Sequence, residues 1–310
     1  MGAGHRTPIL RPASALALTP ALALTLVLAL ASAAGRAAVT VRDDAGNSVT
    51  LAQPARRVIS MAPHITELLF AAGGGARVVG AMNFSDYPEA AKRLPLVGSD
   101  AQIDMERVLA LKPDLLVVWK SGNTARQLEQ LKTLNIPIFY SEPQRLDDIA
   151  TSVTRLGQLL GTDAAAQTAA ADYRRKLAAL SARYAHRPQL RVFYQIWSQP
   201  LYTLNGDHIV SAAISLCGGQ NIFAGLKVVA PQVGIEAVLA ENPEAIIGGE
   251  SHEPSDPGVF LWRRYPSLLA VQRGDLFALG GDALSRATPR MADGIAQLCE
   301  KLETARQHRR

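Results

Sequence analysis

Short apolar runs alternate along most of the chain with segments whose apolar residues recur every three or four positions, as in a helix. This alternation predicts the elements of an α/β fold. After a hairpin expected at 39–51, the first half has predicted strands at residues 57–60, 77–82, 115–119 and 136–140. The second half has them at residues 191–197, 202–204, 245–248 and 276–279. Helical patterns lie between most of these strands, and a closing helix is expected at 289–305. Strands that alternate with helices at this spacing predict parallel βαβ units.

One long helix is predicted at Asp163–Tyr184, near the middle of the chain. The stretch is rich in alanine, leucine, lysine and arginine, and it contains no glycine or proline. Larger apolar residues recur every three or four positions, at Tyr173, Leu177, Leu180 and Tyr184. At about 1.5 Å per residue the helix would span roughly 33 Å. It is either a strut that joins two lobes or one more surface helix of a single domain, and its periodicity alone does not decide between them.

An internal repeat favours the two-lobe interpretation. The segment MERVLALKPDLLVV at 105–118 is similar to IEAVLAENPEAIIG at 235–248, and five identical residues share an offset of 130. Similar offsets on both sides of the long helix are what two related lobes would produce. We therefore expect a first α/β lobe at 39–160, a linking helix at 161–186 and a second α/β lobe at 187–310.

Residues 1–38 have the pattern of a signal peptide. A positively charged start is followed by an eleven-residue apolar run at Ala21–Ala31 and then by small residues, which predicts cleavage near Ala34–Ala38. A membrane anchor is the alternative, because 13–34 is uncharged, but Pro20 interrupts that stretch. No cysteine lies near the cleavage region, which argues against a lipid-anchored N-terminus. We expect a free periplasmic protein.

Charge and motifs argue against nucleic acid as a partner and against an enzyme. The net charge is +5, but residues 1–38 contain three Arg and no acid, which leaves 29 basic and 27 acidic residues and no basic stripe. The sequence contains no G-x-S-x-G, no phosphate-binding G-x-x-x-x-G-K-[ST] and no dinucleotide loop. His252-Glu253 lacks the second histidine of a zinc protease helix.

Two cysteines, Cys217 and Cys299, are the only ones in the sequence. In an exported chain an even count indicates a disulfide. Two buried free thiols are the alternative.

Aromatic residues gather at the ends of predicted strands and in loops. They are Trp119 and Trp197 at strand ends, and Phe84, Tyr87 and Tyr202 in loops. In open α/β sheets, ligands bind beyond the carboxyl ends of the strands. Two such ends facing each other would make a large, flat-walled ligand site, while core packing is the alternative for each aromatic residue taken alone.

Several runs of the sequence together resemble a known family. They are RVISMAPHITELLFAAG, SDYP, MERVLALKPDLLVVWKSGN, CGGQNIF, PQV and SRATPR, and the resemblance covers about residues 56–302. These runs look like the periplasmic cobalamin (vitamin) binding proteins of ABC importers. They belong to the helical-backbone metal receptors, which also include siderophore and haem carriers. The resemblance implies two Rossmann-like α/β lobes with central parallel sheets, joined by a single long backbone helix.

The same resemblance implies the chemistry and the partners. It implies a disulfide between Cys217 and Cys299, cobalamin as the transported ligand and no prosthetic group. It also implies a monomer that delivers its corrinoid to an ABC transporter permease. A siderophore or haem carrier of the same superfamily is the alternative function, and a secreted enzyme is a more distant one.

Ligand contacts are implied by matching positions. They are Pro63, His64, Phe84 and Trp119 on the first lobe, and Tyr202, Asp282 and Arg286 on the second, to which we add Tyr87 and Trp197. Asp100 and Ala230 stand where the family pattern has tryptophan, and Trp197 is expected to supply replacement area. His64 is either an axial metal ligand or, as we favour, a polar contact at the rim of the ligand.

Glu106 and Glu236 are candidate docking residues. Each lies in the first turn of a short predicted helix, where the helix dipole favours an acid in any case. In the family that the sequence resembles, a glutamate on each lobe docks on arginines of the permease. The equivalence of these two residues in the internal repeat favours that role.

Overall fold

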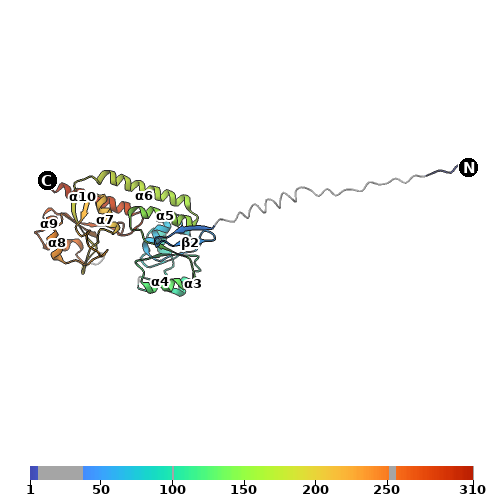
Figure 1. The fold of residues 1–310 in the computed structure, drawn as a ribbon, viewed down its shortest axis with the longest axis horizontal. Coiled ribbons are helices and arrows are strands. Elements are labelled where there is room, and N and C mark those ends of the chain that lie inside the picture. The colour runs from blue at the N-terminus through green and yellow to red at the C-terminus, as the bar shows by residue number, and fades with distance from the viewer. Residues whose placement is uncertain (6–37, 100, 251–255, 310) are drawn as a thin grey trace. The chain divides into compact units, whose positions relative to one another are not determined.

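Two parallel β-sheets organise the described part of the chain (Figure 1). The computed structural model describes residues 1–5, 38–99, 101–250 and 256–309. The predicted signal peptide therefore lies almost entirely outside the described residues. Each sheet has four strands and belongs to one lobe, and α6 (Asp163–Tyr184) connects the lobes, as the resemblance implied. Within the described ranges, no helix has the length and apolar character needed to cross a bilayer.

The first lobe is built on a sheet with strand order β4-β3-β5-β6. Its strands are β3 (Val58–Ser60), β4 (Val78–Ala81), β5 (Leu115–Trp119) and β6 (Ile138–Ser141). Its helices are α2 (Pro63–Ala71), α3 (Met105–Ala110), α4 (Ala125–Lys132) and α5 (Leu146–Leu160), with 3-10 turns at Gly75–Arg77 and Glu89–Arg93. The predicted hairpin is present as antiparallel β1 (Val39–Arg42) and β2 (Ser48–Leu51).

The second lobe is built on a sheet with strand order β10-β7-β11-β12. Its strands are β7 (Leu190–Gln195), β10 (Gly219–Asn221), β11 (Ala245–Gly249) and β12 (Leu276–Leu279), and β8 (Trp197–Ser198) pairs separately with β9 (Leu201–Tyr202). Its helices are α7 (Ile209–Leu216), α8 (Ile235–Glu241), α9 (Leu269–Arg273) and α10 (Met291–Gln307), with a 3-10 helix at Gly258–Arg264. The sequence did not predict β10, because this edge strand has no apolar run.

The internal repeat extends to the topology. In each sheet the first strand along the chain lies between the second and the third, and the fourth lies at an edge. β5 and β11 have five residues each, with the first four buried and the fifth exposed. Val58 pairs with Leu115 in the first lobe, and Val192 pairs with Ala245 in the second. The two lobes therefore share one strand order and a matching register.

The long helix has the predicted bounds, but its first turn differs from the expected pattern. Gly161 ends α5 in the left-handed conformation with a φ of 62°. The residue type of Thr162, just before the helix, predicts a side-chain N-cap, but its side chain forms no cap hydrogen bond, so that prediction is wrong. Its hydroxyl instead donates a hydrogen bond of 2.6 Å to the carbonyl oxygen of Ala72, and so ties the start of α6 to the end of α2.

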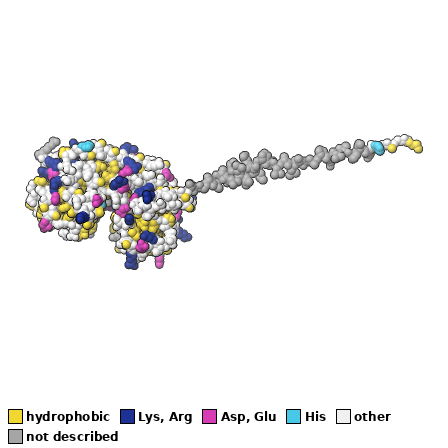
Figure 2. Space-filling model, viewed as in Figure 1, with side chains coloured by type: hydrophobic (Ala, Val, Ile, Leu, Met, Phe, Trp, Pro, Cys, Tyr) yellow, Lys and Arg dark blue, Asp and Glu magenta, His cyan; other side chains and the backbone are white. Residues whose placement is uncertain are grey.

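One buried apolar cluster extends across both lobes. It contains residues of α5 and α6 together with residues of α7 and α10 from the second lobe. The connection between the lobes is therefore broader than a single helix. Cys217, at the end of α7, forms the predicted disulfide with Cys299 of α10, inside the second lobe's part of this core. The space-filling view is hollowed between the two lobes on the side away from α6 (Figure 2).

Candidate ligand-binding site

Trp119 is held in place at the carboxyl end of β5. Its side chain is 38% exposed, and its Nε1 donates a hydrogen bond of 3.2 Å to Glu142. Ser121 donates to the same carboxylate through its backbone nitrogen and its hydroxyl, at 2.8 Å each. The indole lies directly against Gly122, where an added Cβ would be only 1.9 Å from Trp119 Cε3. The exposed indole is thus held in one orientation by its neighbours.

His64 supports the indole from the side. Pro63 and His64 are the first two residues of α2, where the fixed φ of proline suits the start of a helix. The rings of His64 and Trp119 meet edge to face, with centroids 5.0 Å apart and planes at 82°. Burial and, secondarily, the positive charge of Arg286 lower the pKa of His64 to about 4. His64 is therefore a neutral ring that is 8% exposed, packed beneath one edge of the site.

The loop after β4 carries two exposed rings. Phe84 is 65% exposed, with a φ of 62°, and its backbone nitrogen donates to the Asn83 side chain at 2.9 Å. Tyr87 is 45% exposed, and the guanidinium carbon of Arg290 lies 3.9 Å from the centre of its ring. Ser85, between them, accepts a hydrogen bond of 2.9 Å from the buried hydroxyl of Thr66 on α2. The first lobe thus presents three exposed rings, Phe84 and Tyr87 on the loop after β4 and Trp119 at the end of β5.

Trp197 and Tyr202 form the corresponding surface of the second lobe. They pair directly across β8 and β9, so their side chains share one face of this small sheet. Trp197 is 54% exposed, and Tyr202 is half-buried. Sequence analysis missed two neighbours, Val228 and Val229, which are 63% and 48% exposed. Their segment lies beside the residues that follow β9, where the backbone nitrogen of Asn205 donates to the carbonyl oxygen of Val229 at 2.9 Å.

Asp282 and Arg286 lie in a charged cluster between the lobes, although matching positions implied only ligand contacts. Arg286 contacts Asp282 at 2.6 Å within its own lobe, and Asp86 at 2.8 Å and Glu67 at 3.1 Å in the first lobe. Burial alone would raise the pKa of Asp86, but the hydrogen bond and charge of Arg286 hold that pKa below its usual value. Sequence analysis did not identify Glu67.

Glu106 and Glu236 occupy equivalent positions in the two lobes. Each is exposed and is the second residue of its helix, α3 or α8. Within the described ranges, neither carboxylate forms an ion pair. Asp104 caps α3, because its side chain accepts a hydrogen bond from the backbone nitrogen of Arg107 at 2.9 Å.

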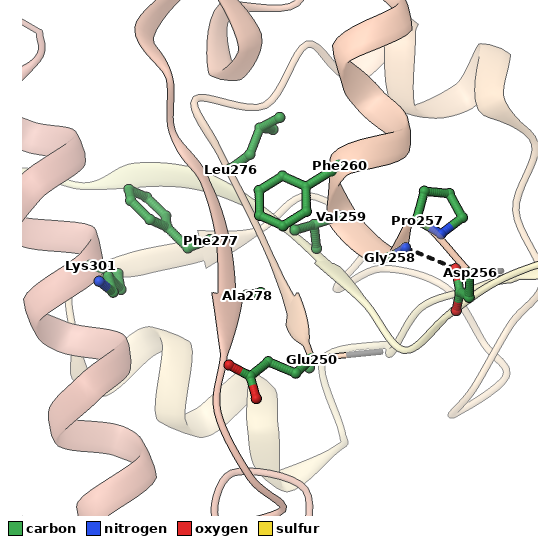
Figure 3. A pocket seen from close by; sticks show the side chains of 11 residues that line it. Glu250, Asp256, Pro257, Gly258, Val259, Phe260, Leu276, Phe277, Ala278 and Lys301 are labelled. Atoms are coloured by element: carbon green, nitrogen blue, oxygen red, sulfur yellow. Dashed lines mark hydrogen bonds between the residues drawn. The ribbon is translucent and has the colours of Figure 1, made fainter. Parts of the chain in front are cut away.

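A separate hollow lies along β12 and the segment after β11. Its lining includes Glu250, Phe260, Phe277 and Lys301 (Figure 3). None of the candidate ligand contacts lines it. Among the described residues, no three His, Cys, Asp or Glu side chains are grouped so that they could hold a metal ion. Asp100 and the segment 251–255, which includes His252 and Glu253, lie outside the described residues.

Comparison with known proteins establishes the family. The sequence profile described as periplasmic binding protein matches residues 58–283. The vitamin B12-binding protein of Vibrio parahaemolyticus is 38% identical over 265 residues, which cover 85% of this chain and 95% of the relative. The chain belongs to the periplasmic binding protein family. It is therefore a binding protein and not an enzyme, as the absence of catalytic motifs had suggested.

Other relatives in this family agree in sequence and in fold. The vitamin B12-binding protein of Yersinia pestis is 41% identical over 251 residues, covering 81% of this chain and 88% of the relative. The crystal structure of the periplasmic vitamin B12-binding protein of Vibrio cholerae has a TM-score of 0.76 and 40% identity, over 82% of this chain and 98% of that one. A periplasmic heme-binding protein from Roseiflexus has a TM-score of 0.69 and 25% identity, over 81% and 99% of the two chains. The two-lobe fold is thus shared with carriers of different ligands.

Proposed function

We propose that this protein captures cobalamin in the periplasm, between its two lobes, and delivers it to the permease of an ABC importer. The observation that carries the proposal is the exposed indole of Trp119 at the carboxyl end of β5, which Glu142 and Gly122 hold in one orientation. The chain is also about 40% identical to vitamin B12-binding proteins. A prepositioned aromatic face suits a large planar ring, because no ordering of the side chain is needed on binding. Cobalamin is the transported ligand and not a prosthetic group.

Affinity would come from apolar walls with a polar rim. Phe84, Tyr87 and Trp119 form the proposed wall of the first lobe, with Pro63 and His64 behind them. The second lobe would contribute Trp197 and Tyr202 to the opposite wall. Asp282 and Arg286 would contact the polar rim. In this arrangement His64 is almost fully buried against the edge of the Trp119 ring, and this burial, rather than its neutral charge state, argues against axial ligation of cobalt.

The proposal is tested by calorimetric titration with cyanocobalamin, with haem and a ferric siderophore titrated in parallel. We expect saturable binding of cyanocobalamin alone. Trp119→Ala should weaken this binding. Phe260→Ala is its matched control, because Phe260 is 42% exposed in the hollow along β12, apart from the proposed walls. Tight binding of haem or the siderophore, without heat from cyanocobalamin, would replace the proposal with the iron-carrier alternative. A ligand spectrum sensitive to His64→Ala would support that alternative.

The proposal also includes export of the protein to the periplasm as a monomer and delivery of cobalamin to the permease. Removal of residues 1–38 as a signal peptide is tested by N-terminal sequencing of the secreted protein, and the monomeric state by light scattering.

Glu106 and Glu236 are proposed to dock on the permease, since both are exposed at equivalent positions. Glu106→Lys or Glu236→Lys should abolish stimulation of the importer's ATPase while cyanocobalamin affinity stays unchanged. Glu129→Lys, an exposed change on α4, is the control; equal activity of all three variants would refute the docking role.

A further inference from the structure

One carboxylate of the first lobe receives four hydrogen bonds from a single short segment of the second lobe. Glu67, on α2, is 3% exposed. Arg290 donates to both of its oxygens, from Nε at 2.9 Å and from Nη2 at 2.6 Å. The hydroxyl of Thr288 donates at 2.9 Å, and Arg286 Nη1 donates at 3.1 Å. A carboxylate has about four acceptor positions, so the segment 286–290 fills those of Glu67.

The two arginines are also held by other groups of the first lobe. Arg286 donates to Asp86 at 2.8 Å, and the guanidinium of Arg290 lies over the ring of Tyr87 at 3.9 Å. Asp86 and Tyr87 belong to the loop that carries the exposed ring of Phe84. The segment 286–290 therefore contacts both the first turns of α2 and the loop that forms part of the proposed ligand wall.

We propose that Glu67 is a positioning residue that fixes the separation of the two lobes and the orientation of Arg286, which contacts both of them. The paired hydrogen bonds from Arg290 supply direction as well as attraction, because a guanidinium and a carboxylate meet in one plane. The shared core of α5, α6, α7 and α10 joins the lobes on one side. The contacts of Glu67 join the lobes at a second place. Two lobes that are joined at two separate places cannot rotate freely about either connection.

Glu67→Gln is the decisive variant, since it keeps the shape of the side chain and removes its charge. Glu303→Gln is a matched control. Glu303 also accepts from two arginines, Arg187 at 2.8 and 3.2 Å and Arg306 at 3.1 Å, but all three residues lie in the second lobe. The Glu303 variant thus loses a similar cluster without touching the contact between lobes.

Lobe separation is measured without any ligand, so this part does not depend on the proposed function. Spin labels are attached to cysteines introduced at exposed Gln130 on α4 and Gln272 on α9, because the disulfide-bonded cysteines do not react. We expect one narrow distance distribution for the unaltered protein and for Glu303→Gln, and a broader or displaced one for Glu67→Gln. An unchanged distribution for Glu67→Gln would overturn the proposal.

Ligand affinity is the second measurement, and it does rest on the proposed function. At a temperature where all variants are folded, Glu67→Gln should weaken cyanocobalamin binding by roughly tenfold to a hundredfold, by analogy with the loss of a group that orients a metal-binding residue. A lower melting temperature with unchanged distances and affinity would make Glu67 a purely stabilising residue and overturn the inference. Should the unaltered protein not bind cyanocobalamin, only the proposed function fails, and the distances still decide.

A milder variant covers the case in which Glu67→Gln does not fold. Arg290→Lys keeps the positive charge but loses the paired geometry, so it should broaden the distances to a smaller extent. Unaltered distances in Arg290→Lys would equally contradict the proposal.

Discussion

The orientation of Trp119 depends on the absence of a side chain at Gly122. A Cβ at that position would lie 1.9 Å from Trp119 Cε3 and 2.2 Å from Cδ2, whereas carbon atoms pack at about 3.5–4.0 Å. Gly122 is not among the residues with a positive φ, so alanine suits its backbone. Gly122→Ala should therefore displace the indole by about 1.5 Å or more, and this would break the hydrogen bond from Trp119 Nε1 to Glu142.

The expected loss of affinity follows from the exposed area of the ring. Trp119 is 38% exposed. A tryptophan buries at most about 250 Å², so the exposed part is about 95 Å², worth about 2.4 kcal/mol if a ligand covers it. Trp119→Ala should therefore raise the dissociation constant about 50-fold. Gly122→Ala should produce much of that loss, although it removes no atom from the ring.

Calorimetry with cyanocobalamin measures both variants, and urea unfolding checks that they are folded. The free energy of unfolding should change by less than about 1 kcal/mol, because position 122 lies in an exposed loop. The control is Gly122→Ala in the Trp119→Ala background, where it should have no further effect on affinity. Wild-type affinity of Gly122→Ala, or an equal loss in both backgrounds, would refute the account of a ring prepositioned by Gly122.

Two further predictions concern stability. The pKa of His64 is lowered from 6.5 to about 4, so between these pH values the unfolded chain binds a proton that the folded protein does not, and the free energy of unfolding should fall by up to roughly 3 kcal/mol as the pH drops from 6.5 to 4. Urea unfolding at several pH values should show a smaller loss for His64→Gln. The same pH dependence in both proteins would contradict this. The disulfide spans a sequence separation of 82, so replacing Cys217 and Cys299 by alanine should lower the free energy of unfolding by about 4.5 kcal/mol; an unchanged urea midpoint would contradict it.

Features set by local sequence were predictable, and those set by distant contacts were not. α6 has the predicted bounds because nothing inside it breaks a helix. Trp119 was placed at a strand end because the run before it is strongly apolar. The edge strand β10 was missed because Gly219–Asn221 has no apolar pattern and pairs with β7 through its backbone. Val228 and Val229 were missed because the exposure of a short apolar run depends on what packs beside it.

Glu67 shows why part of the site was not accessible to sequence analysis. It lies in the run His64-Ile65-Thr66-Glu67-Leu68, where an acid on an apolar helix is the only local signal. Its partners lie more than two hundred residues further on, and no periodicity links the two segments. Arg286 was identified from the family resemblance, but that resemblance gave it a ligand contact and not its contacts with Glu67 and Asp86.

The two lobes anchor their candidate docking helices in the same way. Arg57 donates to the carbonyl oxygen of Leu111 at the end of α3, and Arg191 donates to that of Glu241 at the end of α8, both at 2.7 Å. Each helix is therefore fixed to its own sheet, and the distance between the two proposed docking residues, Glu106 and Glu236, is set by how the lobes are joined. A partner with two equivalent surfaces requires that distance to be constant. If the contacts of Glu67 hold the lobes as we propose, Glu67→Gln should impair docking although it touches neither α3 nor α8.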